Sequence, residues 1–368
     1  MKKEMKYLRP VLIIVLLLVL SAGVYYFVIE KDYSGYTLKL DEKVNETLLK
    51  NGITDADVLS HTWQEKRSGF FSWIVITKEI RQPKKIRIDQ LQEEITKATD
   101  ALQPEISLKR DKETRTVHLY LGKDKKMLVH LVFRMDIKAR LALVIDDLGY
   151  DEKKVEEFLS SGIPFSYSLF PKERYSKKIA ALLQERKIPY LLHLSMEPKG
   201  YPKINPGKQA LLLSMKKKEI LAIVRDSLKA IGAPAGVNNH MGSAFTRERY
   251  GMHVLLSELK KQNVFFLDSV TAIDSSGEFL AKKINEPFVK NDLFLDVEDS
   301  TQATKAKCMQ IVRIAKMNGS AVAIGHIHKK YLLSVLIEMQ PVFEQEGIEL
   351  VYLDKLLETK NTVKRLKK

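Results

Sequence analysis

The stretch Leu141-Ala142-Leu143-Val144-Ile145-Asp146-Asp147-Leu148-Gly149-Tyr150 decides the fold of this 368-residue chain. Five apolar residues run without a break and end at two neighbouring carboxylates. A run this short and this rich in branched side chains is typical of a strand buried on both faces of a parallel sheet. Because α/β proteins place ligands at the carboxyl ends of such strands, the stretch predicts two acids at a site.

The residues after this strand predict a helix and leave the role of the two acids open. Asp151 is expected to cap a helix over about residues 152–160. Neighbouring carboxylates repel each other, so such a pair usually binds a cation or has two well-separated pKa values. The alternative is structural: one acid caps the helix and the other faces solvent.

The composition is that of a globular protein, with 45% hydrophobic and 29% charged residues. The length suggests two soluble domains. The net charge of +15 raises the question of nucleic acid, but Lys and Arg are spread along the chain and no nucleic-acid motif appears. We therefore predict no nucleic-acid partner and favour a basic surface near anionic lipid or an acidic polymer. Cys308 is the only cysteine, which excludes an intramolecular disulfide.

The first residues predict a membrane anchor. Residues 11–29 form an uncharged run of 19 residues, long enough to span a bilayer, and four Lys or Arg residues precede it. The positive-inside rule puts the N-terminus in the cytoplasm and the rest of the chain outside the cytoplasmic membrane, in the periplasm. A cleaved signal peptide is the alternative, although the run is long for one and Ser21-Ala22-Gly23 is a weak cleavage site.

The residues before the deciding stretch predict a small α+β domain. Two alternating strands over 115–121 and 127–133 flank a polar turn, and a helix over 89–102 carries one apolar stripe. Nothing there indicates catalysis, so we expect a spacer or a partner-binding module. The predicted division of the chain is an anchor at 1–34, this domain at 35–136, a β/α domain at 137–358 and a basic tail at 359–368.

From Leu141 onward, predicted strands alternate with helices, which indicates a parallel barrel or an open doubly wound sheet. No glycine-rich G-x-G-x-x-G follows the first strand, so a dinucleotide site is not expected. The strands after the first are predicted at 165–170, 188–194, 236–239, 264–267, 293–295, 321–325 and 348–353.

Polar residues follow the ends of several of these strands. Four of the chain's eight histidines do so, and barrel strand ends converge on one pocket. His and Asp ligands suit Zn²⁺, with Mn²⁺, Fe²⁺ and Ni²⁺ as competitors, and three protein ligands with an open position is the catalytic pattern. Asp268 fits a turn cap equally well, and His328 is more simply an exposed residue before the last helix. The residues at strand ends are His193, Asn239, His240, Asp268, Asp296, His326 and His328.

The chain resembles the divergent polysaccharide deacetylase family in five segments that occur in this order. The resemblance covers residues 140–358 and implies a distorted (β/α)₇ barrel, similar to that of metal-dependent polysaccharide deacetylases. Together with the predicted anchor, this resemblance predicts a membrane-anchored, metal-dependent hydrolase that removes acetyl groups from an envelope glycan, with a polysaccharide or peptidoglycan-type substrate. The segments are LVIDDLGY at 143–150, HLSMEP at 193–198, VNNHMGS at 237–243, FLDS at 266–269 and IGH at 324–326.

The resemblance also implies roles for individual residues. Asp146 is the general base and His326 the general acid. Asp147, His193 and His240 hold a divalent metal, for which zinc is the first candidate.

One departure from the better-studied deacetylases leaves alternatives open. Those enzymes carry both metal histidines in one His-x-x-x-His turn, whereas Glu197 stands four residues after His193 here. Glu197 could itself be a ligand, and Asp146 and Asp147 could have exchanged roles. The residues predicted to bind substrate or support the site are Glu197, Asn239, Ser243, Asp268 and Asp296.

Two other classes of protein remain compatible with the sequence. One is a non-catalytic carbohydrate-binding or scaffold protein on the same barrel. The other is a glycosidase or phosphoesterase, and a glycosidase would need two carboxylates at a separation set by its stereochemistry.

Overall fold

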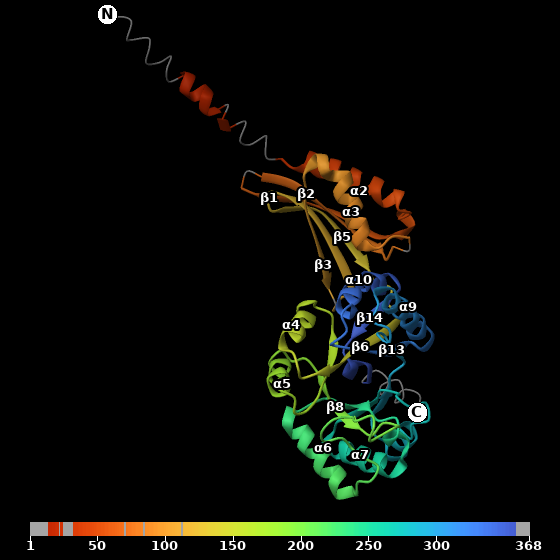
Figure 1. Cartoon of the computed structure of the whole chain (residues 1–368). Coiled ribbons are helices and arrows are strands. Elements are labelled where there is room, and N and C mark those ends of the chain that lie inside the picture. Colours follow the sequence, from red (N-terminus) through yellow and green to blue (C-terminus); the bar gives the residue numbers. More distant parts are fainter. Residues whose placement is uncertain are drawn as a thin grey trace, which may run out of the picture. The chain divides into compact units, whose positions relative to one another are not determined.

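A computed structural model describes residues 14–21, 23–24, 32–69, 71–83, 85–111 and 113–357 (Figure 1). The chain divides into two compact units, Met1–Asp136 and Ile137–Lys368. Each unit has its own hydrophobic core, and each is described here by itself.

Of the predicted anchor at 11–29, residues 14–21 and 23–24 are described and are helical, and the rest lies outside the described residues, as does the whole predicted basic tail at 359–368. Within the described ranges, no helix is both long enough and apolar enough to cross a bilayer. The anchor therefore stays a prediction from the sequence.

The first unit is an α+β domain with a five-stranded sheet in the order β1-β2-β5-β4-β3. Neighbouring strands are antiparallel except β2 and β5, which are parallel. Its elements are α2 (Ser34–Lys50), η1 (Asp55–Asp57), β1 (Val58–Ser68), β2 (Phe71–Arg81), α3 (Ile88–Thr99), η2 (Asp100–Leu102), β3 (Glu105–Asp111), β4 (Thr116–Lys123) and β5 (Lys126–Arg134).

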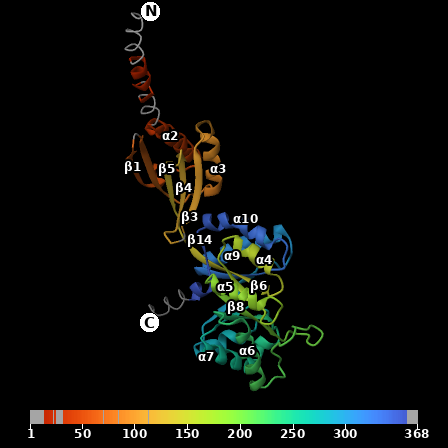
Figure 2. The ribbon, with the colours of Figure 1, turned by 90° about the vertical axis from the view of Figure 1, so that its left-hand side faces the viewer.

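Helices α2 and α3 cover one face of this sheet, as both ribbon views show (Figure 2). Leu40 and Val44 of α2 and Leu91 and Ile95 of α3 are fully buried against the strands. The sequence analysis did not predict strand β1, because almost every residue of β1 is exposed and no apolar alternation marks it. The backbone pairing with β2, rather than burial, makes this segment a strand.

The second unit is an α/β domain, which confirms the α/β part of the predicted fold class. Its parallel strands follow the order β11-β10-β9-β8-β7-β6-β13-β12, with β14 paired to the first half of β6, and the sheet curls as a half-barrel. The elements are β6 (Ala139–Leu148), α4 (Glu152–Ser160), β7 (Phe165–Leu169), α5 (Ser176–Glu185), β8 (Tyr190–Met196), α6 (Lys217–Ile231), β9 (Gly236–Met241), η3 (Phe245–Arg247), α7 (Arg249–Gln262), β10 (Phe265–Asp268), α8 (Gly277–Ile284), β11 (Phe288–Lys290), β12 (Leu293–Phe294), α9 (Thr301–Asn318), β13 (Ser320–His326), α10 (Leu332–Gln345) and β14 (Ile348–Val351).

Strand β6 is buried on both faces, as predicted, and its two faces enter different cores. Leu141 and Leu143 pack in the large core that contains residues of helices α4 to α10. Ala142 and Val144 pack in a smaller core with residues of several other strands and of the segment after β14. The side of the sheet that carries this smaller core is called the inner face below. Alternation along β6 then places Asp146 on the inner face as well.

Candidate metal centre

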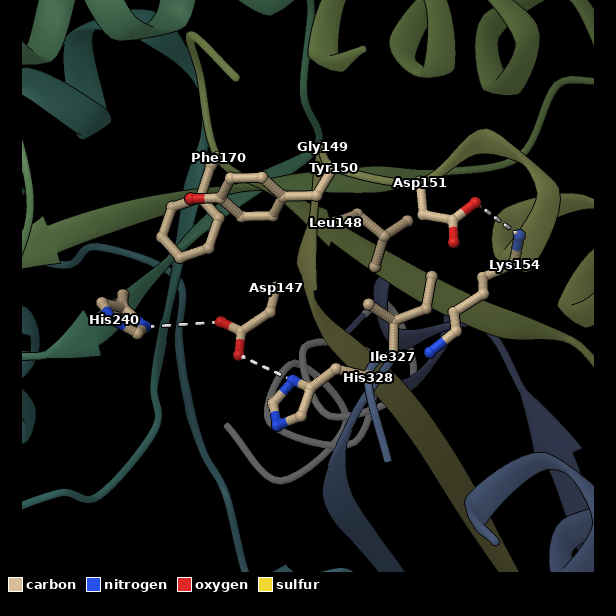
Figure 3. A pocket seen from close by; sticks show the side chains of 10 residues that line it. All are labelled: Asp147, Leu148, Gly149, Tyr150, Asp151, Lys154, Phe170, His240, Ile327 and His328. Carbon is tan, nitrogen blue, oxygen red and sulfur yellow. Dashed lines mark hydrogen bonds and ion pairs between the residues drawn. The ribbon is translucent and has the colours of Figure 1, made fainter. Parts of the chain in front are cut away.

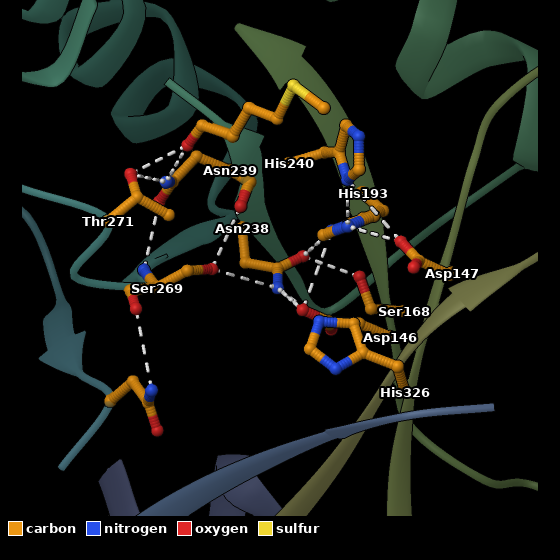
Figure 4. Close-up of polar contacts among 12 residues, drawn as sticks. Asp146, Asp147, Ser168, His193, Asn238, Asn239, His240, Ser269, Thr271 and His326 are labelled. Carbon is orange, nitrogen blue, oxygen red and sulfur yellow. Dashed lines mark hydrogen bonds and ion pairs between the residues drawn. The ribbon is translucent and has the colours of Figure 1, made fainter. Parts of the chain in front are cut away.

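The candidate site lies on the inner face, at the carboxyl ends of the parallel strands (Figure 4). On β8, His193 follows the inner-face residue Leu191 by two positions, and on β13, His326 follows Ile324 in the same way. Because side chains alternate along a strand, this spacing keeps both histidines on the inner face. His326 is also the direct neighbour of Asp146 across the β6–β13 pair.

Asp147 reaches the site only because β6 is irregular at this point. Alternation would point Asp147 away from Asp146, but the β6–β7 pairing shifts between Ile145 and Leu148. Asp147 has a φ of 66°, a left-handed conformation that is uncommon outside glycine. This local irregularity brings two successive carboxylates to the same pocket.

Three side-chain atoms converge at the site: Asp147 Oδ1, His193 Nε2 and His240 Nδ1. Asp147 Oδ1 lies 3.1 Å from His193 Nε2 and 3.4 Å from His240 Nδ1. The two imidazole nitrogens are 3.2 Å apart. Asp147 Oδ1 is buried and has no hydrogen-bond partner of acceptable geometry among the described residues. All three atoms therefore point toward one shared position.

The size of this triangle fits a tetrahedral metal ion. Metal–ligand bonds of about 2.0–2.2 Å place two ligands of a tetrahedron roughly 3.3 Å apart. The three separations, 3.1, 3.2 and 3.4 Å, match one face of such a tetrahedron. A carboxylate and two imidazoles suit Zn²⁺ and the neighbouring transition metals.

Asn238 orients His193 from the side away from the triangle. His193 Nδ1 lies 2.9 Å from Asn238 Oδ1, which also accepts a hydrogen bond from Ser168 Oγ. Asn238 Nδ2 donates to both carboxylate oxygens of Asp146 at 3.0 Å. With the proton on Nδ1, the lone pair of His193 Nε2 is free for a metal. The sequence analysis named Asn239 instead, although alternation from His240 selects Asn238 for the inner face.

Charges at the site are strongly coupled. Burial alone would lower the pKa of His193, but the charge of Asp146 and the contact with Asp147 outweigh it and raise that pKa to about 9. Burial raises the pKa of Asp146. Burial opposes the charge of Asp147 too, yet its contacts with His193 and His240 hold its pKa below the usual value. A bound cation would displace the proton of His193, so acid should weaken metal binding.

His326 is held by Asp296, one of the predicted supporting residues. Asp296 Oδ1 lies 2.9 Å from His326 Nδ1, and Asp296 Oδ2 accepts the backbone N–H of His326. Phe294 stacks on the imidazole with ring centroids 5.8 Å apart. Burial would lower the pKa of His326, but Asp296 and the nearby Asp146 raise it overall. This contact is made through Nδ1 and does not involve Nε2.

The other predicted supporting residues make hydrogen bonds within rim loops. Glu197 accepts the N–H of Leu213, and Ser243 accepts that of Lys199. Asn239 and Asp268 organise the turn after β10: Asn239 bonds to Ser269 and Thr271, while Asp268 accepts from Val270 and Ser275. The structure therefore gives Glu197 a loop contact rather than a place in the triangle.

His328 is a site residue that the sequence analysis did not select. Its Nδ1 lies 3.5 Å from Asp147 Oδ2, and it lines the pocket above the triangle. The sequence contained a sign of this placement, because His328 follows the predicted site residue His326 by only two positions. The pocket has a volume of about 440 Å³ and is lined by Asp147, Leu148, Gly149, Tyr150, Asp151, Lys154, Phe170, His240, Ile327 and His328 (Figure 3).

With this geometry established, comparison with known families decides the classification. The family model described as divergent polysaccharide deacetylase matches residues 143–357. This chain belongs to the divergent polysaccharide deacetylase family. The family segment contains every residue of the triangle together with Asp146, Asp296 and His326.

Two proteins that are similar to this chain in sequence carry the name uncharacterised protein. Protein YibQ of Escherichia coli K12 is 29% identical over 192 residues, which are 52% of this chain and 60% of YibQ. A protein of Haemophilus influenzae is 29% identical over 51% of this chain and 67% of its own length. A solved structure from Agrobacterium tumefaciens C58 shares the fold, with a TM-score of 0.55 and 23% identity over 59% of this chain and 89% of that one.

Gly149 lines the pocket, and replacing it tests whether the backbone there requires a residue without a side chain. It has a φ of 132°, and an added Cβ would lie 2.8 Å from Glu173 Cβ and 2.7 Å from Ser176 Oγ. We expect Gly149→Ala to lower the free energy of unfolding by about 2–4 kcal/mol, from backbone strain and overpacking together. Denaturant unfolding measures this. Gly162→Ala is the matched control, because Gly162 also has positive φ but nothing lies within 4 Å of its Cβ position. Equal losses in the two variants would contradict the predicted clash.

Proposed function

We propose that this protein is a metal-dependent hydrolase that removes acetyl groups from an envelope glycan. The observation that carries this proposal is the triangle of Asp147 Oδ1, His193 Nε2 and His240 Nδ1 beside an open pocket. The buried carboxylate oxygen without a hydrogen-bond partner suits a cation better than a purely structural role. Zinc is the proposed ion because of the ligand types and the tetrahedral spacing.

Asp147, His193 and His240 would hold the metal. When bound there, a divalent ion lowers the pKa of water and polarises an acetyl carbonyl. The remaining steps belong to side chains of the protein. Asp146 is proposed as the base that accepts a proton from the attacking water, and burial moves its pKa toward the neutral range that suits this task.

His326 is proposed as the acid that protonates the leaving nitrogen. Its contact with Asp296 orients the ring and favours the protonated form, so that Nε2 can donate a proton. Proton acceptance by Asp146 and donation by His326 then occur from neighbouring strands, β6 and β13.

Two measurements on the full-length purified protein test the proposal. Elemental analysis should find one divalent ion per chain, and N-acetylated oligosaccharides or peptidoglycan fragments should release acetate until a chelator is added. Release that continues with the chelator would contradict the metal mechanism. Metal binding and glycan binding without acetate release from any acetylated glycan would instead support the binding-protein alternative.

The proposed substrate requires that the second unit lie outside the cytoplasm. The uncharged run at 11–29 and the basic residues before it support this location. A C-terminal fusion to a reporter that is active only in the cytoplasm should therefore give no signal. A strong signal from that fusion, with full-length protein present, would contradict the proposed topology.

A further inference from the structure

Lys154 lines the pocket but has no part in the proposed hydrolysis. It lies in the first turn of α4, is partly buried, and is one of the ten residues that surround the cavity. Figure 3 shows its ammonium group beside Ile327, with Asp147 between it and His240. A cation is thus placed across the pocket from the metal ligands.

No residue in the described ranges makes a hydrogen bond or an ion pair with this ammonium group. The nearest acid in sequence, Asp151, accepts the backbone N–H groups of Lys153 and Lys154 as the cap of α4. Asp147 is turned toward His193, His240 and His328. Neither carboxylate that lines the pocket pairs with the ammonium group, so Lys154 keeps an unpaired charge.

Lys154 also lies at a position in its helix where a positive charge is unfavourable. The first turn of a helix favours acidic side chains and disfavours cations. Lys153 and Lys154 occupy adjacent positions in that turn, but only Lys154 lines the pocket. Because Asp151 already caps the helix end, the ammonium group of Lys154 is the feature that favours an anion at this side of the cavity.

The pocket also offers an apolar surface for a sugar ring. Tyr150 packs edge-on against Phe170 with centroids 5.8 Å apart, and 57% of Tyr150 is exposed at the pocket. The net charge of +15 would attract a polyanion from a distance. Aromatic surface, local cation and overall charge are thus consistent with one class of ligand.

We propose that Lys154 binds a carboxylate of the glycan, so that the substrate is an acidic acetylated polysaccharide rather than a neutral one. This inference rests on the proposed function for the location of the acetyl group. It adds a specificity-determining contact, in which the ammonium group pairs with a uronate or similar carboxylate near the acetylated sugar.

Binding to two oligosaccharides of equal length tests the proposal independently of catalysis. A hyaluronan tetrasaccharide carries N-acetylglucosamine and glucuronate, whereas chitotetraose carries N-acetylglucosamine alone. Calorimetry with the full-length protein should show tighter binding of the hyaluronan tetrasaccharide, and Lys154→Met should weaken it about tenfold, the usual effect of losing one charge-assisted hydrogen bond. Binding of chitotetraose should change less than twofold, and Lys154→Arg should retain the preference.

Lys153→Met is the matched control, because it removes the neighbouring charge of the same helix turn on an exposed side chain. Metal content and the unfolding midpoint should be the same in both Met variants. Equal binding of the two oligosaccharides by the unmodified protein, or equal losses in Lys153→Met and Lys154→Met, would overturn the proposal. Retained preference for the acidic glycan without acetate release would contradict the proposed hydrolysis and leave the role of Lys154 intact.

Discussion

His240→Ala should remove most of the bound divalent ion and abolish chelator-sensitive acetate release. His240 supplies one corner of the three-atom triangle, and alanine offers no atom that could replace its Nδ1 as a ligand. Loss of a residue that only supports a metal ligand costs about 10–100-fold in affinity, so loss of the ligand itself should cost at least about 100-fold. Elemental analysis after dialysis and a competition titration measure this change. Asp147→Ala should have the same effect.

His253→Ala is the control for this experiment, because His253 is an exposed histidine on α7 of the same unit. It should retain metal and activity. The unfolding midpoint of metal-free His240→Ala should match that of the metal-free parent protein, since His240 is partly exposed. Unchanged metal content in both His240→Ala and Asp147→Ala would show that the ion binds elsewhere.

His326→Ala should lower turnover by about 10²–10⁴-fold while metal content stays unchanged. The imidazole lies on the strand beside Asp146, and the triangle does not include it. Asp296→Asn should lower turnover less, because the ring loses a charged partner but keeps a hydrogen-bond acceptor. Steady-state acetate release, together with elemental analysis of each variant, separates loss of the acid from loss of the metal.

The pH dependence of turnover gives a second test of the roles of His326 and Asp296. A general acid acts in its protonated form, so activity should fall as pH rises through the pKa of His326. Asp296 raises that pKa. Asp296→Asn should therefore move the alkaline limb of the profile to lower pH, whereas Asp299→Asn, at an exposed acid of the same loop, should not. An unchanged alkaline limb in Asp296→Asn would exclude His326 as the group that sets it.

The order of elements in the second unit could be predicted from the sequence because each strand carries a strong local signal. The eight predicted strands correspond to eight of the nine strands of its sheet, and the predicted helix at 152–160 with Asp151 as its cap is confirmed. The ninth, β11, was not predicted: only Val289 of its three residues is buried, and pairing with β10 rather than a local pattern makes this segment a strand. In the first unit, β1 gave no hydrophobic pattern because almost all of its residues are exposed.

The inner-face residues could have been predicted from the sequence, because they follow from the alternation of side chains along each strand alone. Counting by two from Leu191 selects His193, and counting by two from His240 selects Asn238. Burial on both faces hides this alternation, since every position of β8 is apolar or buried. Asn239 was therefore chosen where Asn238 makes the contacts with His193 and Asp146.

The sequence by itself determined the α/β class, the family and the presence of acids and histidines at strand ends. Tertiary structure alone decided which of the paired acids faces which partner. Alternation would separate Asp146 from Asp147, and only the irregular pairing of β6 with β7 turns both toward the pocket. It also joined His193 and His240, which are far apart in sequence, by placing β8 and β9 side by side. The physical reason is that strand pairing depends on contacts across the whole sheet, whereas the pattern within one segment reports only its own burial.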